Sequence, residues 1–467
     1  MKRKDIACAR IETTDYPSKG HFHVKETGET GTVKLTIPGQ TVRFRVYKNH
    51  NHHVSGHLLE VVERSPLETR EPACIPFGRC GGCLYQTVPY ASQLELKERQ
   101  IKKLLAPVLD PESVYDGIKG SPREFGYRNK LDLSFGNEEI DGPLTLGMHR
   151  MRSRYSVLDA DTCVLAHPDL TMIAAAIRDY CASAGLPFYN KIRHEGYLRF
   201  VLLRRSETTG EILIVLAATT QRQHDFQPLT KLLLELPLEG RIAGVWLADD
   251  DRYADALIPD RLHCLYGRDY FEERILGLTF RITLFSFFQT NTGGAALLYD
   301  MVRSYVRRSS ETLPEKPVIY DLYCGTGTIA QILAREAGAV YGVEIVPEAV
   351  EAAKQNAELN GLSNCCFYAG DVPEIIPSLP QRPDYVVLDP PREGVHEKTL
   401  KQLLEFGIPH MVYISCKASS FLTDMQFLRG QGWRIERWGL ADLFPQTPNV
   451  EAIALLTRAE SFPHTEE

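Results

Sequence analysis

The chain of 467 residues contains no long apolar run. A membrane-spanning helix needs about 18 or more consecutive apolar residues, so we expect no membrane partner. Residues 1–5 are basic, but no apolar stretch follows them, which is not the pattern of a secretory signal. Internal repeats and low-complexity segments are also lacking. The sequence therefore predicts a cytoplasmic protein built from ordinary globular domains.

Excess positive charge is absent too, since the formal net charge is −7. That balance argues mildly against a polyanionic partner, although local patches rather than net charge decide binding in a long chain. Two basic clusters with interleaved aromatic residues do occur. The first comprises Arg123, Arg128, Lys130, His149, Arg150, Arg152 and Arg154, and the second comprises Lys191, Arg193, His194, Arg199, Arg204 and Arg205. Taken alone, such charge runs favour two solvated strand faces.

A disulfide framework is not expected, because the eleven cysteines are an odd number in a chain without a secretory signal. Three of them, Cys74, Cys80 and Cys83, lie close together in a glycine-rich segment, and Cys163 follows 80 residues later. Four thiolates can bind zinc or an iron–sulfur cluster. Structural zinc sites more often show two close cysteine pairs, and this segment has one. At this point a zinc site, an iron–sulfur cluster and four unliganded cysteines are all alternatives.

The length is sufficient for two to four domains. Residues 1–64 alternate between apolar and polar positions and are broken by turns, which predicts a small β-barrel. Residues 65–285 combine short strands with a helix near 168–184 and are predicted as an α+β domain. A further helix near 90–105 could pack on the last domain. Residues 286–467 follow a β-α-β-α pattern, which predicts an α/β domain with a parallel, doubly wound sheet.

Polar residues follow or end four predicted strands of this last domain. They are Asp321, Glu344, Asp371 and Asp389. Gly325 and Gly327 form a turn after the first strand, where glycine lets the backbone pass close to a ligand. Glu344 lies at the end of the next strand, about 20 residues on, where a ribose diol would be bound. All four strands end at the edge where such folds bind ligands.

Together these motifs resemble the class I S-adenosylmethionine-dependent methyltransferases. The turn lacks a full Gly-x-Gly-x-x-Gly, so a dinucleotide is less favoured, and a nucleotide-binding dehydrogenase is the alternative. The resemblance implies a Rossmann-like fold with S-adenosylmethionine as cofactor. Arg392 follows Asp389-Pro390-Pro391. Enzymes that methylate exocyclic amines usually carry an aromatic residue there, so Arg392 favours carbon as the methyl acceptor.

Cys416 and Glu451 are the candidate catalytic pair. A thiolate can add to C6 of uracil and activate C5, and a carboxylate can later remove the C5 proton. Only the thiolate is competent, so we expect Cys416 in a polar or electropositive environment. The alternatives are a buried core cysteine and a solvated acid. The place of Cys416 at a strand end and of Glu451 before an apolar run favours the catalytic interpretation.

With these residues the chain resembles the RNA 5-methyluridine methyltransferases nearly end to end. The matching motifs include Phe287-Phe288-Gln289-Thr290-Asn291, Ser415-Cys416 and Phe444-Pro445. The resemblance implies that Cys416 is the nucleophile and Glu451 the base, and that Arg128 approaches the target nucleotide, with Arg392 as a second substrate contact. It implies a cofactor site formed by Gln289, Tyr323, Gly325, Gly327, Thr328, Glu344, Asp371 and Asp389. The sequence departs from the family pattern at Thr328, Lys417-Ala418, Gln446 and Asn449.

The ribosomal-RNA branch of that family carries a [4Fe–4S] cluster on a pattern like Cys74, Cys80, Cys83 and Cys163, and the transfer-RNA branch typically lacks it. The resemblance therefore implies an iron–sulfur cluster, ribosomal RNA as substrate, and an N-terminal RNA-binding domain related to OB barrels. No protein partner is inferred. A transfer-RNA methyltransferase with the same chemistry, or a non-catalytic RNA-binding protein, is the alternative.

Overall fold

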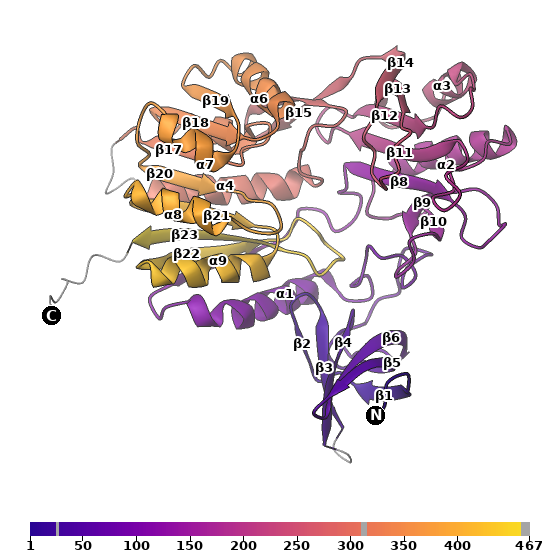
Figure 1. Cartoon of the computed structure of the whole chain (residues 1–467), viewed down its shortest axis with the longest axis horizontal. Helices are drawn as coiled ribbons and strands as arrows, with labels where there is room; N and C mark the ends of the chain where they lie inside the picture. The colour runs from indigo at the N-terminus through magenta and orange to yellow at the C-terminus, as the bar shows by residue number, and fades with distance from the viewer. Residues whose placement is uncertain (25–27, 310–314, 459–467) are drawn as a thin grey trace.

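The computed structural model describes residues 1–24, 28–309 and 315–458. The described residues form three large β-sheets and one two-stranded sheet (Figure 1). Residues 459–467, the end of the predicted last domain, lie outside the described residues. No helix within the described residues is long and apolar enough to cross a membrane.

The N-terminal domain, residues 1–64, is a six-stranded sheet with the order β1-β5-β6-β4-β3-β2. Its strands are β1 (Ile6–Arg10), β2 (Thr13–Asp15), β3 (Lys19–Val24), β4 (Glu29–Lys34), β5 (Thr41–His50) and β6 (His53–Glu63). The predicted closed barrel is wrong for the described residues, because β1 and β2 at the two ends do not pair with each other. β2 has only three residues and lies against helix α1 (Tyr90–Leu105) instead.

The central sheet has seven strands in the order β10-β9-β8-β11-β12-β13-β14. They are β8 (Lys130–Gly136), β9 (Thr145–His149), β10 (Val157–Asp159), β11 (Leu198–Arg205), β12 (Glu211–Ala218), β13 (Arg241–Asp249) and β14 (Arg261–Gly267). Helices α2 (Pro168–Ser183) and α3 (Gln227–Leu234) cover one face, where Ile173, Ile177 and Leu229 are buried. The predicted combination of short strands with a helix near 168–184 is confirmed.

The C-terminal sheet has eight strands in the order β19-β18-β17-β20-β21-β23-β22-β7. They are β7 (Val114–Lys119), β17 (Val318–Leu322), β18 (Ala339–Glu344), β19 (Cys365–Ala369), β20 (Tyr385–Leu388), β21 (His410–Ser415), β22 (Trp433–Ala441) and β23 (Glu451–Arg458). The strands from β17 to β21 are parallel, whereas β23 runs antiparallel between β21 and β22. The predicted α/β architecture is therefore present.

Helices cover both faces of this sheet, as expected of a parallel sheet (Figure 1). On one face lie α4 (Thr292–Ser309), α5 (Thr328–Leu333) and α6 (Pro347–Leu359). On the other lie α1, α7 (Val372–Ile375), α8 (Glu397–Glu405) and α9 (Ala418–Gly430). A hairpin of β15 (Tyr270–Ile275) and β16 (Leu278–Thr283) joins the central and C-terminal domains and packs on α6.

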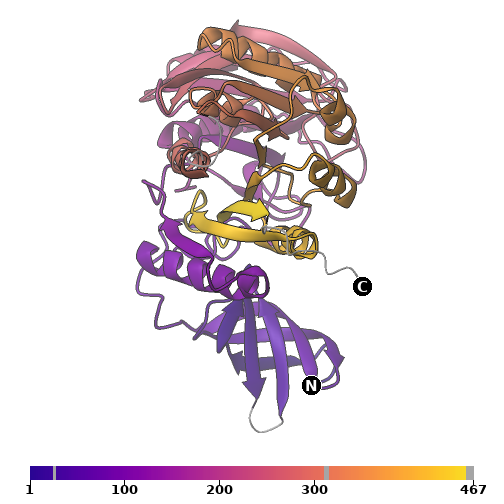
Figure 2. The same cartoon turned by 90° about the vertical axis from the view of Figure 1, so that its left-hand side faces the viewer.

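The C-terminal domain also takes in a segment from the predicted central domain. β7 pairs in parallel with β22 at the edge of the eight-stranded sheet, and α1 packs on α9. Figure 2 shows α1 between the N-terminal sheet and the C-terminal domain. Residues 90–119 therefore belong to the C-terminal domain in space, although about 170 positions separate them in sequence from its start.

A fully buried ion pair joins this inserted segment to the C-terminal sheet. Nζ of Lys97 on α1 lies 2.7 Å from Oδ1 of Asp442, and both side chains are 0% exposed. The same ammonium donates to the carbonyl oxygen of Phe444 at 3.1 Å. Burial lowers the pKa of Lys97 and the Asp442 carboxylate opposes that effect. Neither charge has access to water, so each depends on the other.

We expect Lys97→Met to destabilise the C-terminal domain by about 3–5 kcal/mol, because the substitution leaves a buried carboxylate unpaired. Lys97→Met/Asp442→Asn should be less destabilised than the single variant, since no charge stays buried. Urea unfolding followed by the fluorescence of Trp433 and Trp438, both on β22, measures this. Lys102→Met, which removes an exposed pair with Glu98, is the control and should cost less than about 1 kcal/mol. A double variant as unstable as Lys97→Met would contradict the pairing argument.

Candidate active site

The C-terminal sheet brings its polar strand ends to one edge. Asp321 lies within β17, Glu344 ends β18, Asp371 follows β19 and Asp389 follows β20. Because these strands are parallel neighbours, their carboxyl ends meet at the same edge. The four carboxylates predicted to share a site are therefore brought together by the topology.

The turn after β17 has the backbone shape of a ligand cradle. Tyr323 and Gly327 both adopt positive φ, 65° and 72°, and Gly327 is the N-cap residue of α5. A Cβ on Gly327 would lie 2.6 Å from the ring of Phe367, so no larger residue fits there without displacement. Thr328 is the first residue of α5 and is buried. The open helix start presents backbone N–H groups to the sheet edge.

Two carboxylates define the turn and keep capacity for a ligand. Oε2 of Glu344 accepts a hydrogen bond from Gly325 N at 3.0 Å, which couples β18 to the turn. Oδ2 of Asp321 accepts from Ala330 N at 2.8 Å, whereas its buried Oδ1 has no partner among the described residues. Burial raises the pKa of Asp321 to about 8. An unpaired buried acceptor beside an open helix start fits a small polar ligand such as S-adenosylmethionine.

Cys416 and Glu451 meet because of the antiparallel strand. Ser415, the last residue of β21, is the register partner of Ala452, the second residue of β23. One step further along the ladder, Cys416 follows Ser415 and Glu451 precedes Ala452, so the two residues face each other at the same edge. A pair separated by 35 positions in sequence is thereby placed beside Asp389, at the end of β20.

Burial controls the protonation of this pair. Glu451 is 2% exposed, and burial together with nearby Asp389 raises its pKa to about 8, while Arg392 acts in the opposite direction. Burial, Glu451 and Asp389 raise the pKa of the Cys416 thiol to about 11, again opposed by Arg392. Of the electropositive environment expected for Cys416, Arg392 is the positive charge that lowers the pKa of the thiol. Without a bound ligand the thiol stays protonated at neutral pH.

Two tyrosines at this edge were not found from the sequence. Tyr16, in the turn between β2 and β3 of the N-terminal domain, packs on the same core as Ala418. Burial and the charges of Glu451 and Cys416 raise its pKa to about 12, and a hydrogen bond from the Ala418 backbone opposes the shift. Tyr299 on α4 is 4% exposed, and burial raises its pKa well above 10. No periodicity or spacing connects Tyr16 to a residue 400 positions away.

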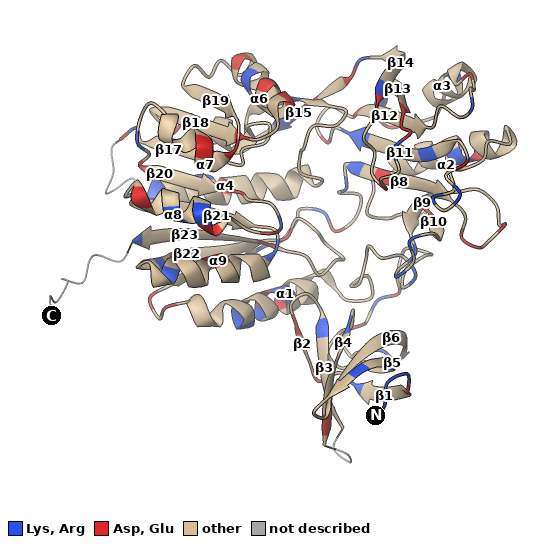
Figure 3. Ribbon diagram, viewed as in Figure 1, with Lys and Arg blue, Asp and Glu red and all other residues tan. Residues whose placement is uncertain are grey.

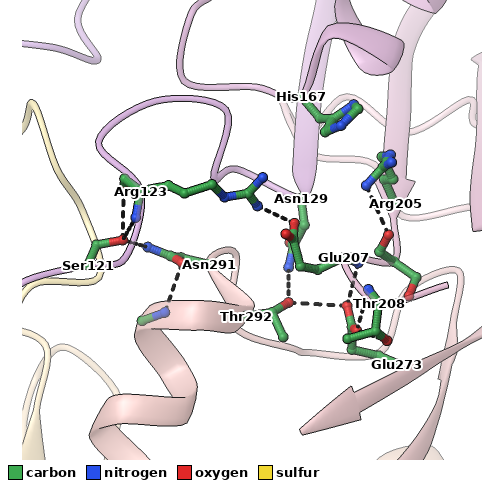
Figure 4. Close-up of polar contacts among 12 residues, drawn as sticks. Ser121, Arg123, Asn129, His167, Arg205, Glu207, Thr208, Glu273, Asn291 and Thr292 are labelled. Carbon is green, nitrogen blue, oxygen red and sulfur yellow. Dashed lines mark hydrogen bonds and ion pairs between the residues drawn. The ribbon is translucent and has the colours of Figure 1, made fainter. Parts of the chain in front are cut away.

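Asn291 and Thr292, which follow Gln289, form a polar junction between domains (Figure 4). Nδ2 of Asn291 donates to Ser121 Oγ at 3.0 Å and to Leu443 O at 2.9 Å. Asn129 Nδ2 donates to Gln289 O and to Thr292 Oγ1, each at 3.0 Å. The side chain of Gln289 lies near Tyr299, whose phenol it hydrogen bonds. The motif therefore ties the start of α4 to the central domain and leaves Gln289 at the sheet edge.

The four predicted metal-ligating cysteines line one cavity of about 270 Å³. Its walls include Cys74, Cys80, Cys83, Cys163 and Arg128. Burial raises the pKa of the first three thiols, that of Cys83 to about 12, and the neighbouring thiols add to the shift. Within the described residues, no three His, Cys, Asp or Glu side chains are arranged to hold a single metal ion. A cubane cluster holds its four sulfur ligands farther apart than one ion does.

Several basic residues predicted to face solvent or substrate lie elsewhere. Arg128 lines the four-cysteine cavity, where its Nε donates to Lys130 O at 3.0 Å, and it is not among the groups that act on Cys416. Arg199, Arg204 and Arg205 are buried, so the solvated-face interpretation is wrong for them. They satisfy carbonyls and carboxylates of the domain itself; Arg204, for example, donates to Thr283 O and Ser286 O, each at 2.7 Å. A buried arginine is easily assigned to the surface from the sequence, because the sequence does not reveal which groups it hydrogen bonds.

Four other residues of the first basic cluster are exposed: Arg123, Arg150, Arg152 and Arg154. Arg150, Arg152 and Arg154 lie between β9 and β10, and Figure 3 marks this loop in blue beside the N-terminal domain. Arg152 donates a hydrogen bond to Leu58 O of that domain. The exposed cations therefore form a continuous surface with the N-terminal sheet, which suits a polyanion better than the net charge does.

Comparison with known proteins identifies relatives along the whole chain. A family described as a methyltransferase domain matches residues 315–431. An uncharacterized RNA methyltransferase of Clostridium tetani is 39% identical over 451 residues, covering 97% of each chain. One from Clostridium acetobutylicum is 39% identical over 458 residues, covering 98% of this chain and 99% of the relative. The crystal structure of Pyrococcus abyssi tRNA (uracil-54, C5)-methyltransferase with S-adenosyl-L-homocysteine shares the fold, with a TM-score of 0.71, 24% identity and coverage of 96% of this chain and 100% of that one.

The raised pKa of Glu451 predicts a pH-dependent stability difference. A carboxyl with a pKa of about 8 in the folded protein and an ordinary value in the unfolded chain stabilises the fold below pH 4.5, and that contribution is lost as the pH rises to 8. Glu451→Gln removes this loss. The melting temperature of the variant relative to the wild type should therefore increase between pH 5 and pH 8 and level off above. Each pKa unit corresponds to about 1.4 kcal/mol. A constant difference across that range would show that Glu451 titrates normally.

Proposed function

This chain belongs to the S-adenosylmethionine-dependent RNA methyltransferases, and we propose that it methylates C5 of a uridine in 23S ribosomal RNA. The observation that carries the proposal is the ladder register that sets the Cys416 thiol opposite the buried Glu451 carboxylate. C5 methylation of a pyrimidine needs a nucleophile that adds to C6 and an acceptor for the C5 proton, both within reach of the same ring. The uracil-C5 activity named for the Pyrococcus abyssi protein supports the same acceptor atom.

The reaction uses the two residues in order. The Cys416 sulfur forms a bond to C6 of the uracil, and the electrons of the C5–C6 double bond give an enolate with carbanion character at C5. C5 then takes the methyl group, which the sulfonium of bound S-adenosylmethionine would supply, with the neutral thioether S-adenosylhomocysteine as the leaving group. Glu451 accepts the proton from C5, the double bond reforms, and the Cys416 sulfur leaves C6. The protein ends with its thiolate restored and one proton on Glu451.

The raised pKa values suit this order. With a pKa of about 8, Glu451 is a stronger base than an exposed glutamate, and this pKa is close to the pH at which the residue must accept a proton. The thiol, with a pKa of about 11, needs a nearby positive charge to ionise. Arg392 provides one such charge, and we propose it as a substrate contact. The cofactor supplies a second positive charge when it binds at the adjacent turn.

We propose that the cofactor is held by residues of the sheet edge and by the motif before α4. Glu344 would take the ribose hydroxyls, and Asp321 Oδ1 is free for a further donor. The proposed set comprises Gln289, Tyr323, Gly325, Gly327, Thr328, Glu344, Asp371 and Asp389. The positive φ of Tyr323 and Gly327 supports the turn as the place where the backbone approaches the ligand.

Ribosomal RNA is favoured over transfer RNA by the four cysteines around one cavity. We propose that Cys74, Cys80, Cys83 and Cys163 hold a [4Fe–4S] cluster there, which fits four thiols in a largely apolar enclosure better than a single ion does. The target uridine would be flipped or splayed from a loop to reach Cys416. The N-terminal sheet and the exposed Arg150, Arg152 and Arg154 would hold the flanking RNA, with Arg128 contributing from the cavity wall.

The transfer-RNA target named for the Pyrococcus abyssi protein is the second candidate. A non-catalytic RNA-binding role is disfavoured, since such a protein has no need of a buried carboxylate opposite a thiol at the sheet edge. Mapping 5-methyluridine in ribosomal and transfer RNA from a deletion strain separates the targets. Loss of a 23S site supports the proposal, and loss of a transfer-RNA site alone would replace it.

The order of steps predicts opposite outcomes for two variants. Cys416→Ala should abolish methylation and form no covalent complex, while S-adenosylmethionine still binds. Glu451→Gln should accumulate a covalent protein–RNA complex, because the C5 proton has no acceptor. Denaturing gels with ribosomal RNA from the deletion strain distinguish these results. Normal turnover by Cys416→Ala would exclude the thiol mechanism, and full activity without a complex in Glu451→Gln would exclude Glu451 as the base.

The cluster proposal predicts protein purified without oxygen to be brown and to contain about four irons per chain. Cys83→Ser should lose most of that iron, since one of the four ligands is replaced. Cys181→Ser, which changes a buried cysteine away from the cavity, is the control and should retain it. Iron analysis and the visible absorption spectrum measure this. Stoichiometric zinc without iron would refute a cluster.

A further inference from the structure

Gln446 occupies an unfavourable backbone conformation just before the proposed base. It lies in the loop of residues 442–450 that connects β22 to β23, and Glu451 is the first residue of β23. Its φ is 69°, in the left-handed region that favours glycine, and its side chain is fully buried. Such a conformation persists only where the surroundings hold it.

Both sides of Gln446 are held by segments far away in sequence. Its carbonyl oxygen accepts hydrogen bonds from Leu84 N at 2.9 Å and Tyr85 N at 3.0 Å. Its backbone N–H donates to Oε1 of Gln93 at 2.9 Å, and Nε2 of Gln93 donates to Oε1 of Gln446 at 2.9 Å. Gln93 lies on α1 and is itself fully buried. One residue therefore receives four hydrogen-bond contacts from two different segments.

The preceding residues of the loop are held in the same way. Lys97 on α1 contacts both the Asp442 carboxylate and the carbonyl oxygen of Phe444. Asn291 Nδ2 donates to Leu443 O at 2.9 Å, and the hydroxyl of Tyr127 donates to Pro445 O at 3.0 Å. Each residue from 442 to 446 thus bonds to a segment outside the β22–β23 hairpin.

The Glu451 carboxylate, by contrast, has no hydrogen-bond donor among residues 1–24, 28–309 and 315–458. Its direction therefore depends on where its backbone is placed. The pairing of Ala441 with Glu451 closes the β22–β23 ladder, so the loop that begins at residue 442 sets the end of that ladder. A loop free to move would let the carboxylate turn away from the substrate ring.

We propose that Gln446 is a positioning residue for Glu451, held by α1 and by the loop of residues 74–86, which carries Cys74, Cys80 and Cys83. This inference rests on the proposed function, because it concerns the step in which Glu451 takes the C5 proton. Leu84 directly follows Cys83, a wall residue of the cysteine cavity. The cavity is therefore connected to Gln446, five residues before the proposed base, through one peptide bond and the N–H groups of Leu84 and Tyr85. The loop of residues 74–86 would then support catalysis by rigidity rather than by electron transfer.

The test separates proton removal from general damage. Gln93→Leu keeps a helix-forming side chain of similar size but removes both contacts to Gln446, together with the hydrogen bonds that Gln93 Nε2 donates to Tyr85 O and Val88 O. Gln446→Ala removes the side-chain contact and keeps the backbone ones. With ribosomal RNA from the deletion strain and S-adenosylmethionine, both full-length variants should accumulate the covalent complex and turn over roughly tenfold to a hundredfold more slowly. Dissociation constants for RNA and cofactor should stay within about twofold of wild type.

Gln402→Leu is the matched control, because it makes the same change on α8 and removes one hydrogen bond to Pro373 O. It should turn over like the wild type and accumulate no complex. Complex formation and turnover that fall together in Gln93→Leu would indicate a merely structural role and overturn the inference. So would turnover equal to that of Gln402→Leu.

A second measurement does not depend on the reaction. Amide hydrogen exchange of residues 444–451, and of Leu84 and Tyr85, should be faster in Gln93→Leu than in wild type and Gln402→Leu. Unchanged exchange would overturn the positioning inference even if methylation is observed. If wild-type protein makes no 5-methyluridine in any RNA, the proposed function fails while faster exchange still supports the coupling of the loop to α1 and the cysteine segment.

Discussion

The buried pair of Lys97 and Asp442 is the constraint on which the arrangement of the molecule depends. Two charges with no access to water can persist only together, so the helix that carries Lys97 must pack on the C-terminal domain whenever that domain is folded. The inner side of α1 thereby holds the loop before Glu451. The outer side receives the N-terminal domain, where Gln100 bonds Thr14 at 2.8 Å and Lys103 pairs with Asp15 at 2.7 Å. One helix thus connects the proposed RNA-docking domain to the proposed base.

The catalytic edge concentrates groups that are costly to ionise. Burial raises the pKa of Asp321, Asp389 and Glu451, and that of the Cys416 thiol, while Arg392 is the cation that opposes the shift at Cys416 and Glu451. Such clustering lowers stability above the ordinary pKa of a carboxyl and is typical of active sites. The same property suits Glu451 to its proposed role as a base and keeps the thiol protonated unless more positive charge than that of Arg392 is present. The unfavourable backbone of Gln446 follows the same logic, since contacts elsewhere hold a conformation that the site requires.

Patterns along the chain predicted the C-terminal architecture because the interactions that form its strands, helices and turns are between residues close in sequence. Alternating strands and helices, the glycine turn and the polar strand ends all follow from side chains within a few residues of each other. The pairing of Cys416 with Glu451 could be predicted as chemistry but not as geometry, because the antiparallel direction of β23 sets it. The predicted barrel was not confirmed, because β1 and β2, which follow each other in the chain, pair with β5 and β3 and not with each other. Arg199, Arg204 and Arg205 were assigned to solvent because their carbonyl and carboxylate partners are remote in sequence.

The sequence by itself determined the proposed reactive groups: the carboxylates at four strand ends, the thiol, the proposed base, and the four cysteines. Their chemistry belongs to the side chains and needs no fold to be recognised. Only the tertiary structure decided which residues surround these groups. It brought β7 and α1 into the C-terminal domain, placed Tyr16 of the N-terminal domain beside Ala418, and joined the cysteine loop to Gln446. Those contacts join segments tens to hundreds of positions apart, where loop-closure entropy is large and no local pattern encodes the partner.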